Sequence, residues 1–156
     1  MPNDEKENAG VVAPPPLIQL GPLVFGLLLN KKFPASFLPP RMARILGWPL
    51  LGSGVLLWGW FIRTLRRGGT PISPYEPVSK LVADGPFRYT RNPGYLSGTI
   101  IYLGVASLAN ALWAVLLLPG TLLVIQRGVI EREESYLERR FGEEYLRYKA
   151  QTRRWI

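Results

Sequence analysis

The chain has 156 residues, 47% of them hydrophobic, and its 19 lysines and arginines outnumber 11 aspartates and glutamates. The apolar residues are concentrated in blocks and the charges fall between them, which is typical of a polytopic membrane protein. Because the cations flank these blocks and form no separate patch on a soluble fold, we expect no nucleic-acid partner. The absence of cysteine and histidine excludes disulfides and thiolate or imidazole chemistry, so we expect no metal site.

The first 67 residues predict a tail and two membrane helices. Residues 1–16 are polar and proline-rich, which indicates a flexible N-terminal tail with a stiff end. The run 17–30 is apolar apart from Gln19; it is short for a span, unless it borrows residues 11–16 or lies tilted in a thin region. The run 45–62 is uncharged and long enough to cross a bilayer. We therefore assign residues 17–67 to the first two transmembrane helices.

A polar stretch, Leu81–Tyr95, separates the two apolar halves. Gly85-Pro86 and Asn92-Pro93-Gly94 predict two turns, with large rings and cations between them. Two rigid turns around such a segment, at the mouth of an apolar helix, can fix side chains around a ligand. The alternative is a basic loop at the membrane interface with an aromatic belt.

The remaining residues predict a helical hairpin followed by charged helices. The runs 95–108 and 112–125 are apolar and separated by three uncharged residues, which favours two helices joined by a tight turn. The segment from Arg127 alternates in charge and continues the last helix into water. Arg127 and Glu131 are four residues apart at the apolar boundary, where unpaired charge is costly, so we expect a functional role for both. For Glu133, Glu134 and Glu138 we expect solvated helix-surface pairs.

These elements predict an all-α polytopic membrane bundle of about four transmembrane helices, with a C-terminal helical hairpin. Four crossings bring the central loop and the C-terminal segment to one face. That face carries fourteen of the nineteen cations, so the positive-inside rule makes it cytoplasmic, together with both termini. Residues 68–156 form one region that comprises the loop, the hairpin and the charged helices.

Several motifs, in this order, resemble the isoprenylcysteine carboxyl methyltransferase family, which belongs to a wider group with the phospholipid methyltransferases. They are the segment Gly85–Tyr95, the apolar hairpin, Glu131–Glu134, Phe141–Tyr145 and a closing Arg154-Trp155-Ile156. The resemblance covers about residues 79–156. It implies an integral membrane enzyme that transfers a methyl group from S-adenosylmethionine to a lipophilic acceptor. It also implies that residues 68–156 are the catalytic region, with a cytoplasmic cofactor pocket.

The resemblance also implies a set of site residues. Glu131 matches the acidic residue that binds the cofactor, and Arg127 matches the catalytic arginine placed toward the substrate. Many relatives have histidine where this chain has Asn92, which cannot titrate, so its role is at most positional. The cofactor-binding set is Ser79, Lys80, Leu81, Val82, Phe87, Asn92, Pro93, Gly94, Tyr95 and Glu131.

Two other functions compete with the methyltransferase. One is a non-catalytic membrane module that keeps the fold for binding or assembly, which the missing histidine favours. The other is a nicotinamide-dependent membrane reductase, whose relatives are usually longer and have more spans. The acceptor stays open between an isoprenylcysteine carboxylate, a lipid amine and a small hydrophobic acid or thiol, and the sequence leaves the oligomeric state open.

Overall fold

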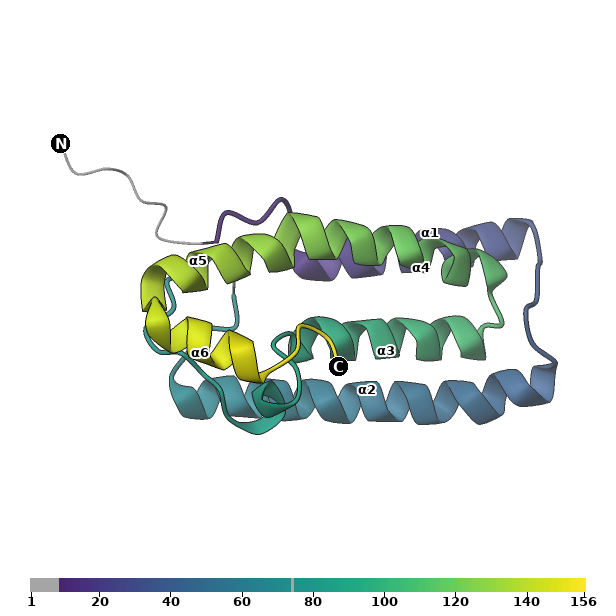
Figure 1. The fold of residues 1–156 in the computed structure, drawn as a ribbon. Helices are drawn as coiled ribbons and strands as arrows, with labels where there is room; N and C mark the ends of the chain where they lie inside the picture. The colour runs from purple at the N-terminus through teal and green to yellow at the C-terminus, as the bar shows by residue number, and fades with distance from the viewer. Residues whose placement is uncertain (1–8, 74) are drawn as a thin grey trace.

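The computed structural model describes residues 9–73 and 75–156, and these form helices and loops without a strand (Figure 1). The predicted all-α class is therefore confirmed, while residues 1–8 of the predicted tail lie outside the described residues. The helices are α1 (Pro15–Lys32), α2 (Pro40–Gly68), α3 (Pro93–Leu108), α4 (Leu112–Ile125), α5 (Glu131–Phe141) and α6 (Glu143–Gln151). A 3₁₀ turn, η1 (Gly85–Arg88), lies in the central loop, and a π-helical turn, η2 (Gln126–Ile130), joins α4 to α5.

The four long helices lie side by side along one axis (Figure 1). α2 packs along α3, and α1 packs along α4. Each helix of the α3–α4 hairpin therefore packs mainly against a helix outside the hairpin and only slightly against its hairpin partner. The predicted hairpin forms, with the three residues 109–111 as its connection, and Tyr102 Oη ties its two helices by donating to the Ala114 carbonyl at 2.7 Å. The charged helix α5 continues the rod of α4, and α6 folds back at the end of the bundle.

Close helix contacts depend on glycine. A Cβ atom at Gly104 of α3 would lie 2.6 Å from the backbone nitrogen of Leu51 in α2. A Cβ atom at Gly26 of α1 would lie 2.5 Å from Cα of Ala114 in α4. Small residues let two helix backbones approach this closely. Such packing holds helices together in a bilayer, where lipid tails are as apolar as the side chains and the hydrophobic effect does not favour association.

Among the described residues, two helices are long and apolar enough to cross a membrane, namely Pro40–Gly68 and the continuous rod Leu112–Phe141. In that rod the apolar part is α4, and the charges begin beyond it, at Arg127. Large apolar side chains of α2 point outward, with Leu56 76% and Trp48 64% exposed, as a lipid-facing helix requires. The chain is thus an integral membrane protein, and the count of four crossings stays a prediction.

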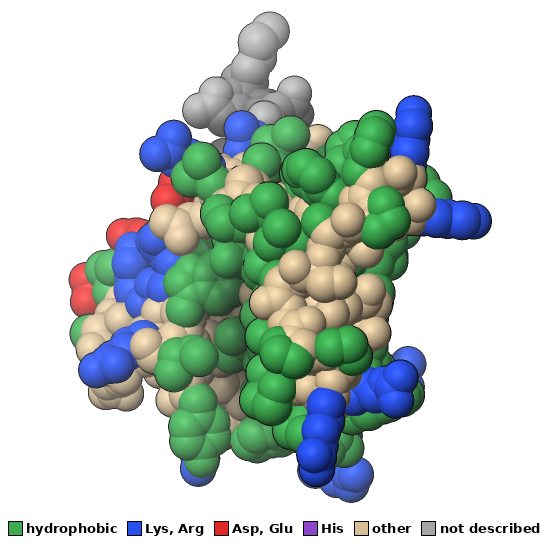
Figure 2. All heavy atoms as spheres, turned by 90° about the vertical axis from the view of Figure 1, so that its right-hand side faces the viewer, with side chains coloured by type: hydrophobic (Ala, Val, Ile, Leu, Met, Phe, Trp, Pro, Cys, Tyr) green, Lys and Arg blue, Asp and Glu red, His purple; other side chains and the backbone are tan. Residues whose placement is uncertain are grey.

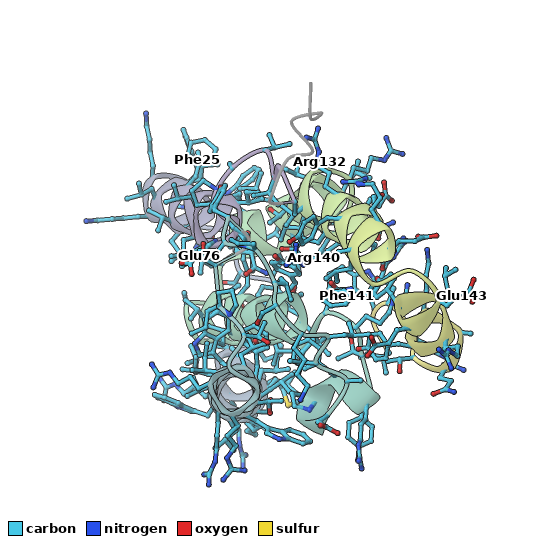
Figure 3. The ribbon with its side chains drawn as sticks, turned by 90° about the vertical axis from the view of Figure 1, so that its left-hand side faces the viewer. Phe25, Glu76, Arg132, Arg140, Phe141 and Glu143 are labelled. Atoms are coloured by element: carbon cyan, nitrogen blue, oxygen red, sulfur yellow. The ribbon has the colours of Figure 1, made fainter. Side chains whose placement is uncertain are left out.

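The two ends of the bundle differ in polarity. The end that carries residues 33–39 and 109–111 shows mostly hydrophobic side chains, with lysines and arginines at its edges (Figure 2). The opposite end carries the central loop, α5 and α6, and Figure 3 labels charged residues of these segments there, among them Glu76, Arg132, Arg140 and Glu143. Any polar chemistry in the protein belongs at this second end.

Candidate active site

A cavity of about 710 Å³ opens at the end that carries α5 and α6, within the size range of small-molecule sites. Segments far apart in the sequence line it: the start of α1, the second half of α2, the central loop, the start of α3, and α5 with α6. Most of the wall is apolar or aromatic. The cavity therefore joins an apolar region between helices to a polar region beneath the charged helices.

The structure brings together most of the residues that the sequence predicts for cofactor binding. Eight of them line the cavity, namely Lys80, Leu81, Val82, Phe87, Asn92, Pro93, Gly94 and Tyr95. Ser79, Glu131 and Arg127 are exposed and are absent from the lining. Glu131 lies 3.8 Å from the guanidinium of Arg154, a loose pair at the surface.

Glu134 lies at the centre of a buried ionic cluster. Its Oε1 accepts hydrogen bonds from Arg91 Nη2 at 2.9 Å and Arg154 Nε at 3.0 Å, and its Oε2 accepts one from Arg154 Nη2 at 2.8 Å. The residue is only 5% exposed, so the expected solvated surface pair is wrong here. Burial alone would raise the pKa of Glu134, but the hydrogen bonds from Arg154 and Arg91 outweigh it and hold the pKa below its usual value.

The segment after α6 holds the central loop in place. The backbone nitrogen of Arg91 donates to the Arg153 carbonyl at 2.9 Å, and Arg91 Nη1 donates to the carbonyls of Lys149 and Thr152. Asn92 Nδ2 donates to the Arg154 carbonyl at 2.9 Å. Asn92 therefore fixes the loop against the last residues of the chain, which is a positional contact that needs no titration.

Glu133 differs from its neighbour because no lysine or arginine among the described residues pairs with it. Its Oε1 accepts a 2.7 Å hydrogen bond from the Tyr95 hydroxyl, and both residues line the cavity. Burial raises the pKa of Glu133 to about 7, although the hydrogen bond from Tyr95 lowers it. A carboxylate in this position can receive a cationic ligand. The sequence-based expectation of a solvated pair is wrong for Glu133 as well.

The π-helical turn explains why Glu133 and Glu134 reach the cavity and the predicted Glu131 does not. A continuous α-helix would place Arg127 and Glu131 on one side, but η2 winds wider and changes the register of everything after it. The acidic residues that reach the cavity are consequently Glu133 and Glu134. The sequence offered one signal for this pair, because both residues belong to the acidic motif that carries the family resemblance.

Other lining residues were not predicted. The ring of Phe61 in α2 packs at a tilt against the ring of Phe87 in the loop, with centroids 5.8 Å apart, and the Tyr148 hydroxyl of α6 donates to the Phe87 carbonyl at 2.8 Å. Tyr136 of α5 accepts a hydrogen bond from the backbone nitrogen of Val78 at 3.2 Å. These contacts depend on segments that meet only in the folded chain. The spacing of three between Tyr145 and Tyr148 is their one visible sequence signal.

The segment before α1 closes another side of the cavity. The backbone nitrogen of Val12 donates to the Gly128 carbonyl in η2 at 3.2 Å, and Arg132 Nη1 donates to the Gly10 carbonyl at 2.9 Å. Figure 3 shows Arg132 beside this segment. The described part of the predicted tail is thus packed against η2 and α5.

A protein-family model and one curated relative match parts of this chain. A family model described as phospholipid methyltransferase matches residues 42–144, from α2 into α6. A protein of Haemophilus influenzae, described as uncharacterized, is 57% identical over 35 residues, which are 22% of this chain and 56% of that relative. The chain thus spans about half the length of this curated relative. No solved structure matches the chain.

Proposed function

Because the chain belongs to the phospholipid methyltransferase family, a family of membrane methyltransferases, we propose that it transfers a methyl group from S-adenosylmethionine to a lipophilic acceptor held in the bilayer. The observation that carries this proposal is Glu133, a partly buried carboxylate that lines the cavity and has no lysine or arginine partner among the described residues. The methyl donor contains both a sulfonium and an ammonium group.

The residues of the cavity fit this cofactor chemically. Glu133 can hold the ammonium group through a charge-assisted hydrogen bond, and Lys80 at the exposed rim can meet the carboxylate of the same amino-acid part. The rings of Phe87, Phe61 and Tyr95 offer aromatic faces to a sulfonium or an adenine. When bound, the cofactor supplies an activated methyl group on a positively charged sulfur.

The chain's contribution to such a transfer is alignment and exclusion of water. Movement of a methyl group from a sulfonium to a lone pair disperses charge, so positioning matters more than acid–base groups. Glu134, Arg91 and Arg154 fix the loop that forms one wall, and the segment before α1 fixes another. The absence of histidine and cysteine is compatible with this chemistry.

The apolar end of the cavity supports a lipophilic acceptor. Leu20 and Leu23 of α1 and Trp58 of α2 line it, and Leu20 is 52% exposed on the outer face. A hydrocarbon chain fits such a wall, whereas a polar acceptor would lose its hydration there. We further propose that the α5–α6 end faces the cytoplasm, on the support of the cation distribution. A carboxylate acceptor of the isoprenylcysteine type has less support, because Arg127 lies outside the lining.

Calorimetric titration of the purified protein in detergent with S-adenosylmethionine tests the proposal. Replacement of Glu133 by Gln removes a charge-assisted hydrogen bond and should weaken binding about tenfold or more. Glu131→Gln is the matched control, since it removes an equal charge two residues away at the surface. Equal losses in the two variants, or no binding by the wild-type protein, would contradict the assignment.

A further inference from the structure

A second hollow, a groove of about 500 Å³, lies on the exposed side of α2 near the C-terminal end of the helix. The described residues that line it all belong to α2, namely Trp58, Gly59, Ile62, Arg63, Arg66 and Arg67. Trp58 is the one described residue that also lines the cavity of the candidate active site. The groove is therefore a separate feature, and the proposed methyl transfer gives it no role.

The groove has an apolar half and a cationic half, because residues three and four apart lie on the same side of a helix. Trp58 and Ile62 are one turn apart and form the apolar half. Arg63 and Arg66 follow on the same side and begin the cationic half. A Cβ atom added at Gly59 would meet nothing within 4 Å, so the missing side chain keeps the groove open.

The three arginines of the groove have no anionic partner of their own. All three are exposed, and no aspartate or glutamate among the described residues forms an ion pair with them. Arg63 and Arg67 are four residues apart, and like charges at this spacing destabilise a helix. Cations in the last turn favour a helix C-terminus, which accounts for Arg66 and Arg67 but not for Arg63 one turn earlier. A bound anion would relieve the repulsion among them.

The depth of the groove in a bilayer matches the two parts of a lipid molecule. The uncharged run 45–62 of α2 extends about 27 Å along the helix, close to the roughly 30 Å of a hydrocarbon core. Arg63 therefore lies where hydrocarbon meets headgroups, and Arg66 and Arg67 lie beside the headgroups of the leaflet on the α5–α6 side (Figure 1). Trp58 lies about 12 Å along the helix from Arg66, at the level of the acyl chains.

We infer that this groove binds a phospholipid with a net negative headgroup, whose phosphate lies among the three arginines and whose acyl chain lies on Trp58 and Ile62. Guanidinium groups form bidentate hydrogen bonds with phosphate, and each cation near an anionic headgroup contributes roughly fivefold in affinity. A zwitterionic phospholipid carries an ammonium group that offsets its phosphate, and a free phosphate leaves the apolar half empty. The lipid is a bound ligand on the outside of α2, so the inference does not depend on methyl transfer.

Native mass spectrometry of the full-length protein in detergent tests the charge of the groove, with phosphatidylglycerol and phosphatidylcholine of identical acyl chains in competition. We expect the wild type to prefer phosphatidylglycerol about tenfold or more, and replacement of all three arginines of the groove by Gln to reduce the preference below about twofold. The matched control replaces Lys31, Arg41 and Arg44, exposed at the other end of the bundle, and should keep the preference. Equal binding of the two lipids by the wild type, or equal losses in the two triple variants, would overturn the inference.

A second pair of variants tests the shape of the groove at constant charge. Gly59→Leu fills the groove, and Gly52→Leu is its matched control, because an added Cβ at Gly52 also meets nothing within 4 Å and the residue lies two turns away on the same side of α2. We expect the affinity for phosphatidylglycerol to fall about tenfold in Gly59→Leu and to change less than about twofold in Gly52→Leu. Unchanged affinity in Gly59→Leu would mean that the arginines act only as diffuse charge and would overturn the inference.

Glycerophosphate separates a lipid from a soluble phosphate as the ligand, because it carries the headgroup phosphate without acyl chains. Added in large excess, it should leave phosphatidylglycerol bound to the wild type. Displacement of the lipid by glycerophosphate would assign the groove to a soluble anion and would overturn the inference.

Discussion

Two adjacent carboxylates of α5 have different environments, and this difference defines the site. Glu134 shares its oxygens between two guanidinium groups and is buried as an ion. Glu133 has one neutral partner, the Tyr95 hydroxyl, and faces the cavity. Environments that push the pKa values of neighbouring groups apart assign them different tasks. Glu134 holds the wall of the cavity, while Glu133 is available to a ligand.

The pH dependence of cofactor binding tests the task of Glu133. Its pKa is about 7 in the folded protein, so it is mostly protonated below that value and mostly ionised above it. If the carboxylate binds an ammonium group, the affinity should rise as the pH increases through about 7 and then level off. Titration calorimetry over this range should show the rise in the wild type and a flat profile in Glu133→Gln. A rise of equal size in the variant would assign the titration to another group.

The task of Glu134 is tested by stability. Glu134→Gln keeps the volume but leaves the guanidinium groups of Arg91 and Arg154 without a full countercharge, and loss of one partner from a buried pair costs about 3 kcal/mol. Thermal unfolding in detergent should show a clearly lower midpoint. Glu138→Gln breaks the half-exposed pair with Lys149 and should cost less than about 1 kcal/mol. Similar decreases of the unfolding midpoint in the two variants would mean that the ionic cluster around Glu134 adds little to stability.

At the scale of elements, the π-helical turn decides which side of α5 faces the cavity. Its one extra residue per turn rotates the following helix by about 100° relative to an uninterrupted α-helix. The Val12 backbone nitrogen and the Trp155 indole both donate to this turn, at the Gly128 carbonyl and at Gln126 Oε1. The turn therefore sets the register of the acidic residues and anchors segments from both ends of the chain.

Insertion of one alanine between Ile130 and Glu131 tests this role. With η2 kept, the added residue rotates everything after it by about 100°, which turns Glu133 away from Tyr95 and Glu134 away from Arg91. We expect cofactor binding to fall below detection while the protein still inserts into the membrane, as measured by calorimetry and by membrane fractionation. Deletion of Gly128 is the control, since the turn can then close into a continuous α-helix that keeps Glu133 on the same side. Full binding by the insertion variant would show that the register is not set here.

The helices were largely predictable from the sequence, whereas the residues of the candidate site were predictable only in part. Apolar runs predicted α3 and α4 to within two residues, because desolvation forces helices where backbone groups cannot meet water. α2 extends beyond its predicted run, since arginines in its last turn favour the helix C-terminus and Gly69 ends it with φ of 66°. The burial of Glu134 was not predictable from spacing. It requires arginines 43 residues before and 20 residues after it to meet at one carboxylate.

At the scale of the whole molecule, polarity separates the two ends of the bundle. The central loop, α5 and α6 meet at one end (Figure 1), and residues of these segments form the ionic cluster and line the cavity. The connections 33–39 and 109–111 meet at the other, where Asn110 Oδ1 accepts hydrogen bonds from the backbone nitrogens of Phe37 and Leu38. If the helices span the bilayer in the proposed orientation, with the first end inside, a cofactor from the cytosol reaches the cavity at that end.

Labelling of single cysteines tests the orientation, and the natural chain helps because it contains no cysteine. Ser36→Cys lies in the exposed connection after α1, and Glu144→Cys lies on the exposed side of α6. Four crossings with the cation-rich end inside place these two positions on opposite sides, so a membrane-impermeant thiol reagent added to intact cells should label the first and spare the second. Opening the cells should expose both positions. Labelling of both from outside would contradict the four-helix crossing. Labelling of Glu144→Cys alone would keep the crossings and reverse the orientation, which would leave the cavity without access to a cytoplasmic methyl donor.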